Sequence, residues 1–198
     1  MNKRLIKRAA RLYATTYLAG IMGVFIYLSV GVLISAAAPS GRAMNVAAMT
    51  ITNAVALFLQ AGLYFCIVYG KQWERGDKDA NAVQFGKLAD DPWRGVKVGL
   101  LAAVPSFVSW LVLVADKCFG IWPHIAMVYR LCQVGLYPIV VWSMGSEVMV
   151  PSSAVGWGGI VCAGMPVLFL PVVAGLAYFF GYRHIQVWER LVFVRKKK

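Results

Sequence analysis

The sequence predicts an all-α integral membrane protein with four transmembrane helices and one further helix, lateral or re-entrant, on the outer face. Three observations lead to this class. Of the 198 residues, 60% are apolar and only 14% are charged, whereas a soluble domain is about half apolar and about a quarter charged. Four long apolar segments recur along the chain, and the basic residues gather in alternate segments between them. A soluble globular protein and a disordered chain are therefore excluded.

The four apolar segments are each long enough to cross a bilayer, which takes about 20 residues of helix. We expect spans at about 13–37, 44–70, 97–115 and 157–182, all within one membrane domain covering residues 1–198. The first segment follows a basic head and could be mistaken for a signal peptide. Its 25 uncharged residues are about twice the usual 7–15 of a signal peptide's apolar region. We therefore interpret it as an uncleaved span.

The distribution of lysine and arginine predicts the orientation of these spans. Five basic residues lie in the head, six lie between residues 71 and 97, and six lie in the tail 183–198. Only Arg42, Lys117 and Arg130 fall on the opposite side. Because basic loops stay cytoplasmic, we expect both termini in the cytoplasm and the protein in the plasma (inner) membrane.

The segment 125–142 is apolar but carries Arg130 near its middle. Arg130, Gln133 and Tyr137 share one face of a helix, which favours a helix lying in the membrane interface with this stripe toward water. A re-entrant hairpin and a fifth span are the alternatives. A fifth span would move the basic tail outside and bury Arg130, which is costly unless the charge is paired. Candidate partners for Arg130 on the outer face are Glu147 and Asp116.

The loop 71–96 is expected to be cytoplasmic, ordered and compact, because its acidic residues nearly balance its bases. Gly76 is a suitable end for the second span. Asp91 is a suitable N-cap for the third span, with Pro92 in its first turn.

The start of this loop resembles the opening of a calcium-binding EF-hand. Asp77, Asp79 and Asn81 have the right spacing, but Ala82 and Leu88 replace the glycine and glutamate that the motif needs. An irregular cation site of Asp77, Asp79 and Asp90 is the alternative to a solvated turn. We favour the turn and expect no metal site.

Motifs for catalysis are missing from the sequence. It has no P-loop, no dinucleotide-binding fingerprint, no metalloprotease pair of histidines and no nucleophile elbow. The two histidines, His124 and His184, are expected on opposite faces of the membrane. We therefore predict a protein that is not an enzyme and needs no cofactor.

Four cysteines occur, without a Cys-x-x-Cys motif. Cys66 and Cys162 lie in spans and are expected to be small packing residues. Cys118 and Cys132 are both expected outside, where either a disulfide or two free thiols is compatible with the spacing.

Polar residues within the spans are the remaining candidates for a site. Asn53 and Gln60 are seven residues apart on one face of the second span, and Ser106 and Ser109 lie in the third. Because buried amides need partners, the Asn53–Gln60 face should point inward. We favour hydrogen bonds between helices as the role of these four residues; the alternative is a polar cavity covered by 125–142.

Two functions follow from these features. The first is a non-enzymatic subunit or accessory factor of a membrane assembly, with a membrane protein as partner. The second is a small-solute binding or transport protein with a cavity among the spans. The basic tail 183–198 is expected to bind anionic lipid at the bilayer surface, and no nucleic acid is expected as a partner.

Overall fold

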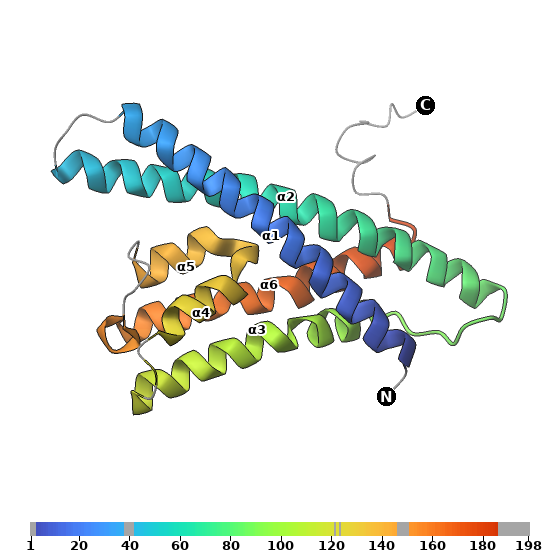
Figure 1. Ribbon diagram of the computed structural model, residues 1–198. Helices are drawn as coiled ribbons and strands as arrows, with labels where there is room; N and C mark the ends of the chain where they lie inside the picture. The colour runs from blue at the N-terminus through green and yellow to red at the C-terminus, as the bar shows by residue number, and fades with distance from the viewer. Residues whose placement is uncertain (1–2, 38–41, 121, 123, 146–150, 186–198) are drawn as a thin grey trace.

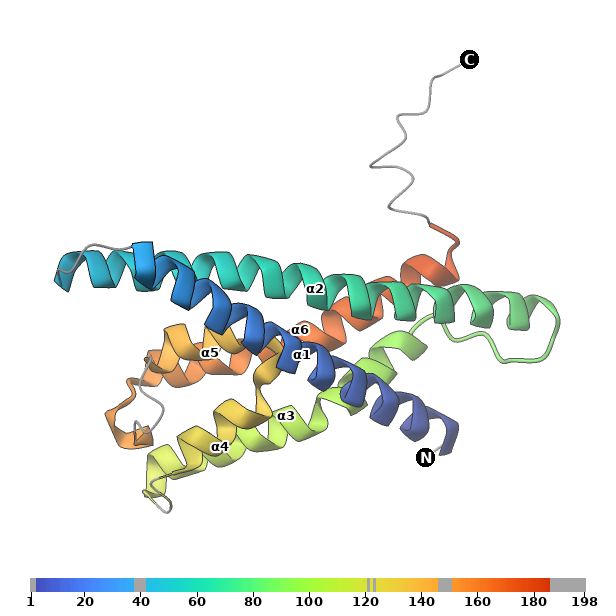
Figure 2. The same ribbon diagram turned by 45° about the horizontal axis from the view of Figure 1, so that its top comes forward.

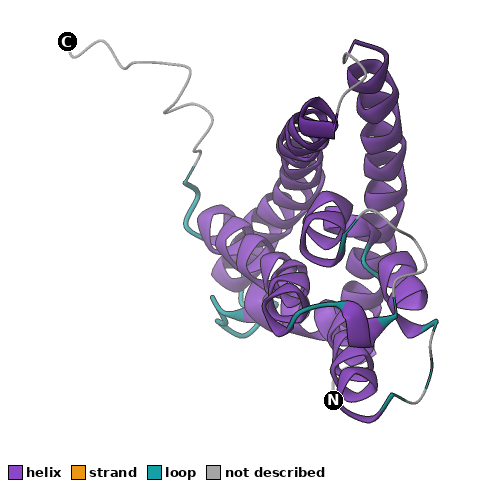
Figure 3. Cartoon of the chain, turned by 90° about the vertical axis from the view of Figure 1, so that its left-hand side faces the viewer, coloured by secondary structure: helices purple, strands orange, loops and turns teal. Residues whose placement is uncertain are grey.

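A computed structural model describes residues 3–37, 42–120, 122, 124–145 and 151–185, and every regular element in these ranges is helical (Figures 1 and 3). Four long helices, α1, α2, α3 and α6, are long and apolar enough to cross a membrane. The elements are α1 (Lys3–Ala37), α2 (Arg42–Gln84), α3 (Arg94–Phe119), α4 (Ile125–Cys132), a 3₁₀ turn η1 (Val134–Leu136), α5 (Tyr137–Met144), a second 3₁₀ turn η2 (Ser152–Ala154) and α6 (Trp157–Tyr182). The predicted all-helical fold with four helices of spanning length is confirmed.

The long helices define two ends of the bundle. The start of α1, the end of α2, the start of α3 and the end of α6 lie at the right in Figure 1, and we call this the basic end. The last turns of α1 and α3 and the first turns of α2 and α6 lie at the opposite end, which we call the far end. The basic end is therefore the one predicted to face the cytoplasm.

The predicted loop 71–96 is wrong over most of its length, because α2 continues through it to Gln84. Gly76 does not end the helix. A Cβ atom at this position would lie 2.7 Å from the backbone nitrogen of Tyr182 and even closer to the carbonyl oxygen of Tyr178. Gly181 has the same relation to the backbone of Trp73. The two glycines therefore allow α2 and α6 to cross in backbone contact, and the charged segment 71–84 is an amphipathic extension of the helix.

The other helix bounds differ less from the prediction. α6 matches the expected span 157–182, α1 extends back to Lys3 through the basic head, and α3 runs from Arg94 to Phe119. The prediction that Asp91 is the N-cap of α3 is wrong, because Trp93 occupies that position. The carboxylate of Asp91 instead accepts from Lys97 at 2.9 Å, and its carbonyl oxygen accepts from the N–H of Arg94 at 3.2 Å. The helix begins at Arg94, two residues after Pro92, and Trp93 occupies the N-cap position without a side-chain hydrogen bond.

The segment 125–142 is not one continuous helix, and its form is closer to the hairpin named above as an alternative. The chain forms α4 and α5, which meet at a bend of 71° around η1. Pro138 lies in the first turn of α5, where a missing N–H costs nothing. Figures 1 and 2 show that α4 begins, and α5 ends, at the far end. Residues 125–144 therefore form a bent helix pair whose two ends lie at the same end of the bundle, and we call this pair the α4–α5 hairpin.

The polar stripe of this segment is buried rather than exposed to solvent. Arg130 and Gln133 are only 3% and 4% exposed, and the half-buried ring of Tyr137 meets Tyr27 edge-on at 5.4 Å. The spacing shows that the three residues share a face, but it does not show which side of the helix the bundle covers. Arg130 donates to carbonyl oxygens at the end of α5, and Gln133 donates to a carbonyl oxygen of α3, so both side chains face into the bundle.

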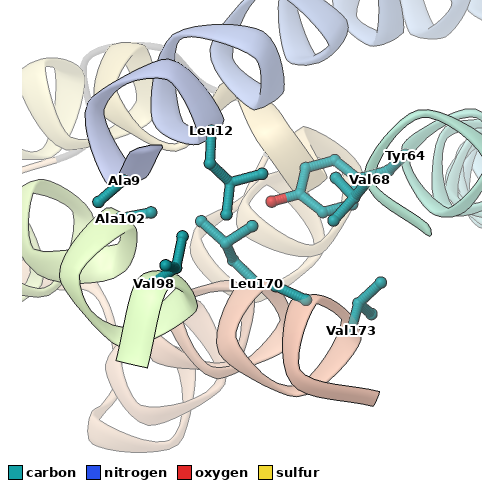
Figure 4. Close-up of a cluster of buried hydrophobic side chains, with 9 residues drawn as sticks. Ala9, Leu12, Tyr64, Val68, Val98, Ala102, Leu170 and Val173 are labelled. Carbon is teal, nitrogen blue, oxygen red and sulfur yellow. The ribbon is translucent and has the colours of Figure 1, made fainter. Parts of the chain in front are cut away.

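Two clusters of apolar side chains form the core. The cluster nearer the basic end draws on all four long helices, with Leu12 of α1, Val68 of α2, Val98 of α3 and Leu170 of α6 pointing at one another (Figure 4). The second cluster packs the α4–α5 hairpin, including Tyr129, against α3 and α6. The hairpin thus replaces a missing central helix in the far half of the bundle.

Candidate functional site

The tip of the α4–α5 hairpin lies between α1 and α2, at the middle of the bundle. Gly20 of α1 lies directly against it: a Cβ atom there would be 2.7 Å from the backbone carbon of Val134. On the side of the tip that faces α2, a Cβ atom at Gly135 would lie 3.3 Å from the ring of Tyr64. The two glycines, Gly20 in α1 and Gly135 in the hairpin, therefore let the hairpin backbone pack closely against α1 and α2.

Three polar side chains bind backbone carbonyl groups around this tip. Gln60 Nε2 donates to the carbonyl oxygen of Val134 at 2.8 Å, and the hydroxyl of Tyr17 donates to that of Leu131 at 3.1 Å. Leu131 lies in the last turn of α4 and Val134 lies in the 3₁₀ turn η1, where carbonyl groups lose their regular α-helical partners. The polar residues thus stabilise the break itself.

The third contact joins the hairpin to α3. Gln133 Nε2 donates to the carbonyl oxygen of Ser106 at 3.3 Å. The hydroxyl of Ser109 donates to the same oxygen at 2.8 Å, within its own helix. Pro105 lies beside Ser106 inside α3, where proline removes a backbone donor.

The four predicted site residues therefore fall into two groups. Gln60 and Ser106 meet the hairpin tip from α2 and α3, whereas Ser109 binds only within α3. Asn53 is 2% exposed, two helical turns from Gln60, and its Oδ1 has no hydrogen-bond partner among the described residues. The inward orientation expected for the Asn53–Gln60 face agrees with the burial of both amides.

A small cavity adjoins the tip. Its volume is about 30 Å³, and its polar lining includes Thr16, Tyr64, Ser106 and Gln133. Asn53 and Gln60 do not line it. The space accommodates about one or two water molecules. Thr16 and Tyr64 were not predicted from the sequence, because a lone polar residue in a span has no spacing signal.

Arg130 connects the two arms of the hairpin. Its Nη2 donates to the carbonyl oxygens of Met144 at 3.3 Å and Gly145 at 3.0 Å, while Nε and Nη1 have no partner in the part of the chain that the structure describes. Glu147 lies outside the described residues, so the predicted Arg130–Glu147 pair stays a prediction.

The alternative partner, Asp116, is held elsewhere. Its carboxylate accepts from the backbone N–H of Trp122 at 2.6 Å and from the hydroxyl of Ser152 at 2.5 Å. These two contacts attach both connections of the hairpin to the end of α3. Asp116 therefore anchors the far-end loops and does not neutralise Arg130.

A second polar cluster lies at the basic end, centred on Asp79, which is 6% exposed. The carboxylate accepts from Arg8 at 2.7 and 3.1 Å, from Arg94 at 3.3 Å and from the hydroxyl of Tyr178 at 3.0 Å. One carboxylate of α2 thus binds α1, α3 and α6. We call these four residues the Asp79 clasp.

The other acidic residues of this region have separate partners. Asp77 pairs with His184 at 2.8 Å, and Asp90 accepts from the hydroxyl of Tyr182. Asp77, Asp79 and Asp90 therefore do not converge on one point. No group of three metal-binding side chains occurs among the described residues.

The cysteines of the chain are all free thiols. Cys118 is exposed in the last turn of α3, whereas Cys132 is half-buried and lines the central cavity. Cys66 and Cys162 are exposed, so the expectation that they are packing residues is wrong. Both lie on faces that the bundle leaves uncovered.

Three larger pockets are open grooves between neighbouring helices. A groove of about 520 Å³ is lined by α2, α5 and α6, including Leu57, Trp142 and Cys162. A groove of about 500 Å³ lies between α1 and α2, and one of about 300 Å³ lies between α1 and α3. Comparison of the chain with protein-family models, curated proteins and solved structures finds no match.

Proposed function

We propose that this chain is a non-enzymatic subunit or accessory factor of a membrane assembly, which crosses the membrane four times and keeps both termini in the cytoplasm. The observation that carries the proposal is the filled centre of the bundle. The hairpin tip occupies the middle, and the cavity beside it measures about 30 Å³. A small-solute carrier would need at least about ten times this space in the bundle centre, since ligand pockets measure about 300–1,000 Å³.

The buried carboxylates support a structural role. Asp79 and Asp116 are the buried acidic residues of the described part of the chain. The first holds four helices together and the second holds the far-end loops. Their acceptor sites are directed at helix contacts rather than at a cavity.

The far-end groove between α2, α5 and α6 is the surface that we assign to a partner. Its floor contains Gly158, Gly159 and Cys162, and a Cβ atom added at Gly158 would meet nothing within 4 Å. Transmembrane helices associate through small residues that let the backbones approach closely. The occupant we propose is therefore a transmembrane helix of another protein, packed across Gly158 and Cys162.

Photo-crosslinking in native membranes tests this proposal. A photoreactive amino acid replaces Met165, which is 59% exposed and lines the far-end groove. The matched control carries it at Phe25 on α1, which is 66% exposed and lies outside the grooves. A protein adduct of one defined mass at Met165, absent at Phe25, supports a subunit role. Lipid adducts alone at both positions would contradict it.

The predicted binding of anionic lipid by the tail 183–198 belongs to this proposal as well. Residues 186–198 lie outside the described residues. The proposed orientation, with the basic end in the cytoplasm, is supported by the concentration of lysine and arginine at that end.

A further inference from the structure

The groove between α1 and α2 leads from the apolar surface to a group of basic residues. Its apolar walls are formed by Leu18 and Met22 of α1 and by Cys66 and Ile67 of α2. Toward the basic end it is lined by Thr15, Gly70, Lys71 and Glu74. The volume of about 500 Å³ is open along one side, so a flexible chain could lie in it without entering the bundle.

The mouth of this groove is rich in unpaired positive charge. Lys71 lines it directly, Arg75 follows one turn later on the same face of α2, and Arg11 lies one turn before Thr15 on α1. Among the described residues, neither Arg11 nor Lys71 forms an ion pair. The one carboxylate in the lining, Glu74, is bound by Lys78.

Arg75 needs an anion more than its neighbours do. Its Nη1 atom is buried and has no hydrogen-bond partner in the described ranges. Burial lowers the pKa of Arg75, and the positive charges of Arg8 and Arg11 lower it further against the attraction of Asp79 and Glu74. A buried donor without a partner is costly, and an anion at the groove mouth would offset the repulsion among the positive charges of Arg8, Arg11 and Arg75.

The dimensions agree with one leaflet of a bilayer. Arg11 and Met22 are eleven residues apart on one helix, which corresponds to about 16 Å. Half of the hydrocarbon core measures about 15 Å. A headgroup at Arg11 and Arg75 would therefore leave its acyl chain to run past Leu18 as far as Met22.

We propose that the α1–α2 groove binds an anionic phospholipid of the leaflet at the basic end, with its phosphate between Arg11, Lys71 and Arg75 and one acyl chain against Leu18, Met22 and Cys66. This inference depends on the membrane placement given above but not on a protein partner. The two grooves share α2 but no lining residue, so loss of lipid binding here should leave the crosslink at Met165 intact.

The natural cysteines supply the first test. Wild-type protein in detergent is mixed with phosphatidylglycerol or with phosphatidylcholine of the same acyl chains. It is then alkylated by N-ethylmaleimide, and the extent of alkylation of each cysteine is measured by peptide mass spectrometry. Phosphatidylglycerol should suppress alkylation of Cys66 and leave Cys118 and Cys162, which are exposed elsewhere, unchanged. Equal protection by both lipids, protection of all three cysteines or no protection would each overturn the proposal.

Charge variants test the headgroup site. In native mass spectrometry, Arg11→Gln combined with Arg75→Gln should lower the occupancy of phosphatidylglycerol by about fivefold for each base removed. The control combines Lys3→Gln with Lys87→Gln, which removes two exposed bases of the same end and should keep wild-type occupancy. An equal loss in both variants would mean that binding follows net charge and would overturn a defined site.

A third variant protects the test against misfolding. Cys66→Trp fills the exposed groove without touching a charge, and it should abolish the preference for phosphatidylglycerol while the thermal stability without lipid stays at the wild-type value. A retained preference in this variant would contradict an acyl chain in the groove.

Discussion

The Asp79 clasp allows the sharpest prediction about stability. Asp79→Asn keeps the size and shape of the side chain and removes its charge. In the wild-type protein this carboxylate accepts two hydrogen bonds from Arg8, one from Arg94 and one from Tyr178. An amide retains one acceptor oxygen and presents two N–H donors to two arginines, which can only donate.

The magnitude follows from the exposure of the partners. Removing one member of a buried ion pair costs about 3–5 kcal/mol. The side chain of Arg94 is 15% exposed and that of Arg8 is 38% exposed, so water screens the larger part of the Arg8 contribution. We therefore expect a loss of about 2–3 kcal/mol in the free energy of unfolding.

The assay is thermal unfolding in a mild detergent, read by the fraction of protein that remains monodisperse in size-exclusion chromatography. The matched control is Glu74→Gln, five residues earlier on α2. Glu74 pairs with Lys78, and their side chains are 60% and 69% exposed. Because water screens this exposed pair, its removal should leave the stability at the wild-type value.

Two results would refute the reasoning. One is a stability of Asp79→Asn equal to that of Glu74→Gln, which would mean that the clasp does not hold the helices together. The other is full additivity of Asp79→Asn and Arg8→Gln, since residues in one ion-pair network should show a coupling energy.

Three further predictions concern the helix crossing, the hairpin tip and the thiols. Gly76→Ala forces α2 away from Tyr178 and should cost about 1–3 kcal/mol in the same unfolding assay, whereas Gly70→Ala, where an added Cβ meets nothing within 4 Å, should not lower stability, since alanine favours a helix over glycine; equal losses would contradict the close crossing. Gln60→Leu loses the bond to Val134 and should lower stability by about 1–2 kcal/mol; no loss would contradict the tip geometry. On intact cells, a membrane-impermeant maleimide should label Cys118 but not Cys132, which labels only after denaturation; labelling of Cys132 would place the tip at the surface.

The spans were predictable because lipid imposes length and composition on them. α6 matches residues 157–182 since both of its ends coincide with the ends of an uncharged run. The predicted second span ends at residue 70, where the charged residues begin, whereas α2 continues to Gln84. The buried positions Gln72, Gly76, Asp79 and Ala80 have helical spacing, but most of them are polar or glycine, so the sequence shows no apolar period that predicts the extension of α2.

The site was less predictable, since it depends on contacts between segments far apart in the chain. Gln60 was correctly identified as an inward polar residue, but its partner is a carbonyl group that exists only where α4 breaks. Arg8 was counted as a cytoplasmic charge, and its pairing with Asp79, 71 residues away, leaves no mark in either local pattern. The burial of Arg130 was missed because its compensating carbonyls belong to the end of the same hairpin.

The location of both chain termini tests the central claim most directly, namely a four-span bundle closed by a re-entrant hairpin. Reporters that are active on only one side of the membrane are fused before Met1 and after Lys198 of the full chain. The account predicts that both termini are cytoplasmic, because the α4–α5 hairpin enters and leaves at the far end. A cytoplasmic N-terminus with an external C-terminus would mean that residues 125–144 cross the membrane, and it would contradict the account.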